Sequence, residues 1–150
     1  MRRARVPVLT FAIVSLLVWT TRIRNIVGDD TMERPEKVGR VGLALTFATL
    51  AVAVLVAYWR KALPALAALV TGLAGWTTGV WLFMSATIVV DPEHSRGFKI
   101  VHAGLALVSI ALAVVAVAAV KRAFAEDASS EGPADTPDAP TETLVPSGSG

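Results

Sequence analysis

Two histidines and their acidic neighbours are the first side chains in this sequence that could do chemistry. His94 lies close to Asp91 and Glu93, and His102 follows further along the chain. Nitrogen and oxygen ligands gathered in this way can bind a divalent cation at a membrane surface. Their spacing matches no defined metal signature, and the absence of cysteine excludes thiolate sites, iron–sulfur clusters and disulfides. We therefore expect neither a metal nor a cofactor, with Asp91 and His94 as the only pair worth testing.

Aromatic and hydroxyl side chains inside an apolar stretch form a second candidate. A tryptophan ring can bind a cation or an apolar molecule through its face. Hydroxyl groups can line a polar path between helices. The alternative is that the rings fill volume between helices and give their N–H groups to neighbours. The residues concerned are Trp76, Thr77, Thr78, Trp81 and Ser85.

Small residues in the same stretch recur at a helical spacing. Thr71, Gly75 and Gly79 fall four residues apart, and Gly72 adjoins them. In lipid, small residues let helices approach closely, so this face is typical of a packing surface. It could serve packing within the chain, an oligomer seam, or the wall of a conducting path.

Four long apolar stretches must position all of these residues. A bilayer core about 30 Å thick needs about 20 apolar residues to cross it as a helix. The sequence therefore predicts an all-α polytopic membrane protein, an antiparallel bundle of four transmembrane helices, with residues 1–122 as the membrane domain. The stretches without Asp, Glu, Lys or Arg are Val6–Thr21, Val41–Trp59, Ala65–Val90 and Ile100–Val120, and the predicted helices span about 6–27, 41–59, 65–90 and 100–120.

The overall composition supports this class of protein. The chain is 54% hydrophobic and 17% charged, whereas a soluble domain averages roughly 45–50% apolar and 25% charged residues. This balance excludes a soluble enzyme and a nucleic-acid binder. The basic isoelectric point reflects Lys and Arg at the helix ends, where they anchor helices at the headgroups. Residues 123–150 are acidic and rich in Pro, Ser and Gly, which predicts a disordered tail.

Basic and aromatic residues near the helix ends bear on the orientation. Lys and Arg are tied at seven on each side, and the leading basic cluster favours both termini in the cytoplasm. The first apolar stretch is expected to be retained, because no small-residue cleavage site follows it. Trp19, Tyr58 and Trp59 are expected at the membrane edges. Arg22 and Arg24 are expected to point outward from the end of the first helix.

One motif resembles a known family. Residues 79–85, Gly-Val-Trp-Leu-Phe-Met-Ser, resemble the G-x-W-L-x-x-S core of the SPW-repeat membrane proteins of bacteria. The resemblance covers only the third and fourth predicted helices. Ala86 and Thr87 stand where the family has Pro and Trp, and the first two helices show no clear second copy. The resemblance implies a small integral protein of a bacterial plasma membrane with no assigned role.

These features predict a non-enzymatic accessory or interaction component. Its partners are the lipid bilayer and, through the glycine-bearing face, a second copy or a larger membrane complex, with no nucleic acid. The alternative is a small transporter or channel that acts as an oligomer. A membrane enzyme that uses Asp91, His94 or Arg24 is the third possibility.

Overall fold

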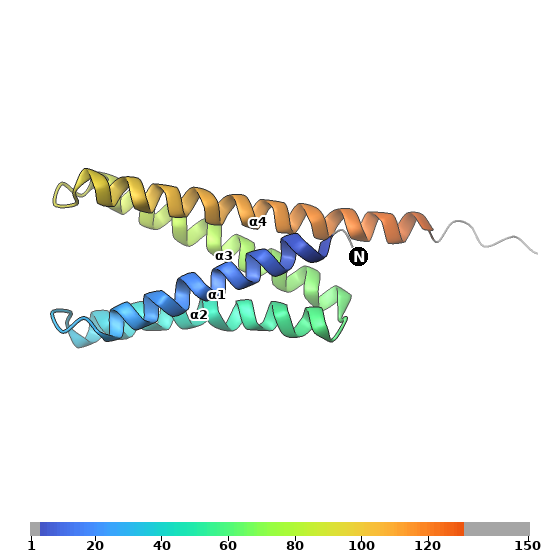
Figure 1. The fold of residues 1–150 in the computed structure, drawn as a ribbon, viewed down its shortest axis with the longest axis horizontal. Coiled ribbons are helices and arrows are strands. Elements are labelled where there is room, and N and C mark those ends of the chain that lie inside the picture. Colours follow the sequence, from blue (N-terminus) through green and yellow to red (C-terminus); the bar gives the residue numbers. More distant parts are fainter. Residues whose placement is uncertain (1–3, 131–150) are drawn as a thin grey trace, which may run out of the picture.

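The computed structural model describes residues 4–130, which form four α-helices joined by short connections (Figure 1). Each helix is long and apolar enough to cross a membrane. Residues 4–130 contain no strand. The predicted all-helical fold is confirmed, and the helices are consistent with a multi-pass membrane protein. Their bounds are α1 Arg5–Val27, α2 Arg34–Trp59, α3 Leu63–Val90 and α4 Arg96–Ser130.

The second helix begins earlier than the sequence predicted. α2 starts at Arg34 rather than at residue 41. Pro35 lies in the first turn, where the missing N–H of proline leaves no helical hydrogen bond unmade. Glu36 and Arg40 form an ion pair one turn apart on this added segment. The polar residues between the first two apolar stretches therefore extend the helix.

The fourth helix is longer than predicted at both ends. α4 starts at Arg96 rather than at residue 100 and continues to Ser130. Ala123 is buried and Phe124 packs against the core, so tertiary contacts hold the helix beyond residue 122. α4 therefore extends eight residues into the predicted tail, as far as Ser130. Residues 131–150 of the predicted tail lie outside the described residues.

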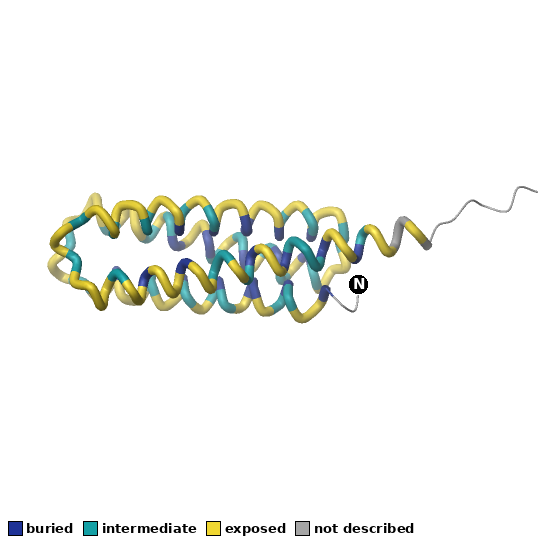
Figure 2. Tube along the Cα trace, turned by 90° about the horizontal axis from the view of Figure 1, so that it is seen from above, coloured by how far each residue is buried: buried dark blue, intermediate teal, exposed yellow. Residues whose placement is uncertain are grey.

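The four helices are arranged as two hairpins. α1 packs along α2, α3 packs along α4, and the hairpins meet through α1–α4 and α2–α3 contacts. The hairpins converge near the 60–62 connection and diverge toward the 28–33 and 91–95 connections (Figure 1). Buried positions follow the inner faces of the helices, and the outer faces are exposed (Figure 2). The largest fully buried side chains include Phe11, Phe47 and Leu73.

The two hairpins are copies of one sequence unit. Of the 53 positions from residue 8 to residue 60, 18 hold the same residue type as the position 62 residues further on. The apolar composition explains shared Ala, Val and Leu, but it does not explain shared charged residues and tryptophan. The informative pairs are Trp19 and Trp81, Asp29 and Asp91, Arg34 and Arg96, Lys37 and Lys99, and Arg60 and Arg122.

Equivalent residues of the two hairpins also make equivalent hydrogen bonds. In each hairpin, a lysine in the first turn of the second helix donates to a carbonyl at the end of the first helix. An aspartate after each first helix accepts the N–H of the residue two positions on. The bonds are Lys37 Nζ to Val27 O (3.3 Å) and Lys99 Nζ to Val89 O (2.9 Å), and Thr31 N to Asp29 Oδ1 (3.0 Å) and Glu93 N to Asp91 Oδ1 (2.9 Å).

Burial follows the same repeat. The inner stripe of α1 contains Val8, Phe11, Ala12, Ser15 and Trp19. The residues 62 positions later, Val70, Leu73, Ala74, Thr77 and Trp81, form the buried stripe of α3. The contacts between helices also correspond: α1–α2 matches α3–α4, and α1–α4 matches α2–α3. A two-fold rotation about an axis along the helices relates helices in this way. The protein is therefore a tandem repeat of two helical hairpins, although only Val18 and Trp19 of the motif at residues 79–85 recur in α1.

Candidate functional site

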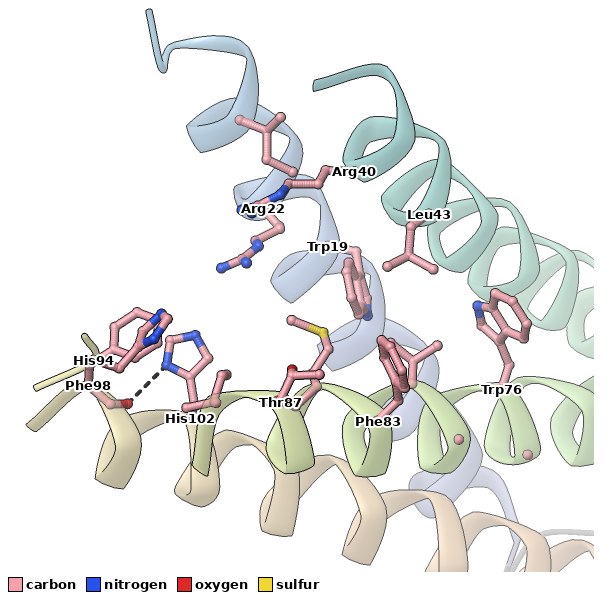
Figure 3. Close-up of a pocket in the computed structure, with 16 residues that line it drawn as sticks. Trp19, Arg22, Arg40, Leu43, Trp76, Phe83, Thr87, His94, Phe98 and His102 are labelled. Carbon is pink, nitrogen blue, oxygen red and sulfur yellow. Dashed lines mark hydrogen bonds between the residues drawn. The ribbon is translucent and has the colours of Figure 1, made fainter. Parts of the chain in front are cut away.

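A cavity of about 590 Å³ lies between the two hairpins at their divergent end (Figure 3). This volume is in the range of small-molecule sites in proteins, roughly 300–1,000 Å³. α1 and α2 supply one wall, and α3 with the start of α4 supplies the other. The lining residues labelled in Figure 3 are Trp19, Arg22, Arg40, Leu43, Trp76, Phe83, Thr87, His94, Phe98 and His102.

Aromatic rings form the deep end of this cleft. Trp19 is only 5% exposed and stacks on Phe47, with ring centroids 3.9 Å apart and planes at 10°. The ring centroid of its repeat equivalent Trp81 lies 6.4 Å from that of Trp19, and the ring centroid of Trp76 lies 6.1 Å from that of Phe47. The ring of Trp19 is thus part of the packing between the helices and does not face outward from the helices. Trp59 is 75% exposed near the opposite end.

Two arginines from the first hairpin line the cleft. Arg22 is half-buried and points toward the second hairpin (Figure 3), whereas the neighbouring Arg24 is exposed. The outward position predicted for Arg22 is therefore wrong. Arg40 pairs with Glu36. Within residues 4–130, Arg22 forms no ion pair, so its charge in the cleft is not neutralised by a carboxylate.

Three tilted rings lie in a row at the start of α4 and just before it. Phe98 lies between His94 and His102, with ring centroids 4.4 Å and 3.9 Å away. His102 is buried, and its Nδ1 lies 3.0 Å from the carbonyl oxygen of Phe98. This row of rings lines the cleft next to the 91–95 connection (Figure 3).

The predicted metal pair lies at the end of this row of rings. His94 Nδ1 lies 2.9 Å from Asp91 Oδ2. The hydrogen bond from the backbone N–H of Glu93 lowers the pKa of Asp91 below its usual value, and the His94 contact adds to this effect. Such a shift stabilises the folded loop above the ordinary aspartate pKa, and the contribution fades as pH falls through the lowered value. Residues 4–130 hold no group of three or more His, Asp or Glu able to bind a metal, so the pair has no third ligand.

A second, smaller cavity of about 360 Å³ lies on the other side, between α1 and α4. It shares Trp19, Arg22, Met84 and His102 with the larger cavity, so the two lie next to each other between the hairpins. Nine of its ten lining residues have a repeat equivalent in the lining of the larger one. The two cavities are therefore the pseudo-symmetric openings of one cleft.

The glycines of α3 explain why the two openings differ in size. Gly75 and Gly79 line the larger opening. They stand at the repeat positions of Ile13 and Leu17 in α1. A Cβ atom added to either glycine would meet no atom within 4 Å. The missing side chains thus leave open space on one side of the cleft.

The predicted packing face and polar path are dispersed over α3. Gly72 also has open space around it, so the glycines make no close helix contact among residues 4–130. Thr71 and Thr78 lie along an outer groove with α4. Thr77 is buried without a hydrogen-bond partner among the described residues, and Ser85 is half-buried. Trp76 lines the larger opening and Trp81 the smaller one, so these residues do not share one path.

Sequence reasoning missed Arg22 and Arg40 as site residues. Arg22 continues the buried stripe of α1, since it follows Ser15 and Trp19 at the same three-to-four spacing. That periodicity could have placed the guanidinium on the inner face. The role of Arg40 depends on how far the hairpins diverge, which no local pattern reports.

No protein-family model, curated protein or solved structure matches this chain. Its function is therefore inferred from the cleft and its residues.

Proposed function

We propose that this protein is a non-enzymatic membrane component that binds an amphipathic molecule in the cleft between its two hairpins. The observation that carries the proposal is the composition of the larger opening. The aromatic rings of Trp19, Trp76 and Phe83 line it from the buried end to the exposed rim, and charged and polar groups lie toward the connections. An amphipathic molecule has the matching distribution, with an apolar body and a polar end.

The position of the cleft within the fold supports binding over conduction by a single chain. Phe11, Val54 and Leu73 are fully buried in the converged half of the molecule. Their packing fills the space that a continuous path would need. A molecule that enters between α2 and α3 therefore meets a closed end formed by Trp19 and Phe47.

The glycine positions allow a direct test. Replacing Gly79 by Leu introduces the residue that the first repeat carries at Leu17, and the open space around Gly79 should accept it. We expect the variant to fold normally and to lose bound amphiphile, since the side chain occupies the cleft. Native mass spectrometry of the full chain, purified in mild detergent with added phosphatidylglycerol or phosphatidylcholine, measures the loss.

Gly72→Leu is the matched control, because Gly72 has open space but does not line the cleft. It should retain lipid like the unmodified protein. Equal lipid retention by Gly79→Leu, Gly72→Leu and the unmodified chain would contradict binding in the cleft.

A second candidate function is assembly through α3, and the open space around its glycines favours it. Gly72, Gly75 and Gly79 leave their helix backbone accessible from outside the chain. A helix of a second copy or of a larger complex could approach closely there. In that case Gly72→Leu should lower the mass of the detergent-solubilised assembly measured by light scattering, with lipid retention unchanged. A mass equal to that of the unmodified protein would remove this candidate.

The cellular location also belongs to the proposal. The SPW-repeat resemblance supports a bacterial plasma membrane. The basic cluster before the first helix supports cytoplasmic termini. In this orientation the 28–33 and 91–95 connections face outward, and the cleft opens in the outer half of the bilayer.

A further inference from the structure

We propose that the larger opening of the cleft holds the phosphate headgroup of an anionic phospholipid, with Arg22 and Arg40 as its ligands. This inference rests on the proposed function, and it adds the chemical class of the bound molecule. The geometry, charge and depth of the two arginines carry it.

Both arginines lie at the same depth in the membrane domain. Arg22 is five residues from the end of α1, about 8 Å along its axis, and Arg40 is six residues into α2, about 9 Å. The charge-free stretches end just before Arg22 and begin just after Arg40. The two guanidinium groups therefore mark the boundary between hydrocarbon and headgroups, which is where phospholipid phosphates lie.

The charges in the opening are complementary to an anion. Glu36 pairs with Arg40, and Asp91 lies against His94, so these two carboxylates already have partners. Arg22 has no carboxylate partner among residues 4–130. A cation withdrawn from water is stabilised by an ion that pairs with it. Guanidinium groups bind phosphate through two parallel N–H bonds, which suits them to this ligand.

The rest of the opening suits the apolar part of a lipid. Gly75 and Gly79 leave a gap on the α2–α3 side, where a chain from the bilayer can enter. Trp19, Trp76 and Phe83 line the opening beside that gap, with Trp19 buried and the other two rings exposed. One acyl chain can pack on these rings while the phosphate stays with the arginines.

The internal repeat shows that these cations belong to one hairpin only. The residue equivalent to Arg22 is Met84, and the residue equivalent to Arg40 is His102. The first hairpin thus contributes the charge, and the second contributes the space. The repeat also supplies substitutions that the same fold already carries, which makes misfolding of the variants less of a concern.

The test compares repeat-exchange variants of the full chain by native mass spectrometry in mild detergent. Phosphatidylglycerol and phosphatidylcholine with identical acyl chains are added at equal concentrations. We expect the unmodified protein to retain phosphatidylglycerol preferentially. Arg22→Met and Arg40→His should each lower that retention about tenfold, as expected for loss of a charge-assisted hydrogen bond. Arg24→Ala, which introduces the equivalent residue Ala86, removes an exposed arginine of the same helix and should have no effect.

Other outcomes separate this inference from the proposed function. Equal retention of both lipids, insensitive to Arg22→Met but lost in Gly79→Leu, overturns the anion assignment and leaves cleft binding intact. No retained lipid in the unmodified protein overturns both. If one arginine variant elutes as aggregate, phosphatidylglycerol retention by the other variant still tests the proposal, because each arginine is proposed to contact the phosphate separately.

Inorganic phosphate distinguishes a soluble ligand from a lipid. The thermal midpoint of the unmodified protein is measured with phosphate alone and with phosphatidylglycerol. We expect stabilisation by the lipid only. A shift of equal size with phosphate, abolished by Arg22→Met, would overturn the lipid source. A protein that co-purifies and excludes lipid from the cleft would overturn the proposal as well.

Discussion

Trp19 illustrates how a single residue connects the core to the cleft. Its ring stacks on Phe47 from α2 and lies against Trp81 from α3, so it contacts both hairpins. Aromatic pairs in these geometries add to the packing that holds helices together. Because lipid tails are as apolar as the side chains, such packing rather than water exclusion stabilises the helix contacts.

Replacing Trp19 by Ala should therefore be costly. We expect the free energy of unfolding in detergent to fall by about 3 kcal/mol, at the low end for truncation of a buried aromatic ring. Trp59→Ala, at a ring that is 75% exposed, should change it by less than about 0.5 kcal/mol. Denaturant titration of both variants followed by circular dichroism compares the two values. Similar losses in the two variants would show that Trp19 does not support the core.

The connection between the two hairpins depends on how the backbone ends α2. α2 ends at Trp59, and Lys61 then adopts a left-handed conformation with φ of 54°. The N–H of Lys61 donates to the carbonyl of Tyr58 at 3.2 Å, and the N–H of Ala62 donates to that of Ala57 at 3.1 Å. This Schellman pattern satisfies carbonyls at the end of α2 and reverses the chain into α3.

Lys61 is a side chain at a position that favours glycine. We expect Lys61→Gly to raise the free energy of unfolding by about 0.5–1 kcal/mol, because relief of the left-handed backbone outweighs the added freedom of the unfolded chain. Lys61→Ala removes the same charge without that relief and serves as the control. Thermal unfolding in detergent ranks the two. A midpoint for Lys61→Gly at or below that of Lys61→Ala would contradict this interpretation of the turn.

The whole molecule is a symmetric scaffold with an asymmetric cleft. Two copies of a hairpin pack around a pseudo-two-fold axis, and equivalent openings face the two sides. Divergence between the copies has placed arginines in one hairpin and glycines in the other. Both copies cross the membrane in the same direction. The 28–33 and 91–95 connections, which flank the cleft, must therefore lie on one side of the membrane.

Side-specific labelling tests this topology, and the natural chain has no cysteine to interfere. We expect Asp30→Cys and Ser95→Cys to react with an impermeant maleimide on intact cells, and Arg60→Cys only after permeabilisation. Labelling of Asp30→Cys and Ser95→Cys from opposite sides would contradict the fold. Labelling of Arg60→Cys alone on intact cells would reverse the proposed orientation.

The sequence by itself determined the four helices. Long charge-free stretches leave the backbone no option in lipid except to bond within a helix, so composition is sufficient. It did not locate the early start of α2 or the helical segment 123–130, because an ion pair and core contacts decide those ends. It also concealed the repeat, because matching residues are scattered among apolar positions that resemble one another by composition.

The candidate site, in contrast, depends on how distant segments pack against one another. Arg22 and Arg40 belong to different helices, and Gly75 and Gly79 to a third. These residues line one cleft because the hairpins diverge at one end, and that divergence depends on side-chain packing between distant segments. Helical periodicity reports which face of each helix is buried, but it does not report how far apart two buried faces lie.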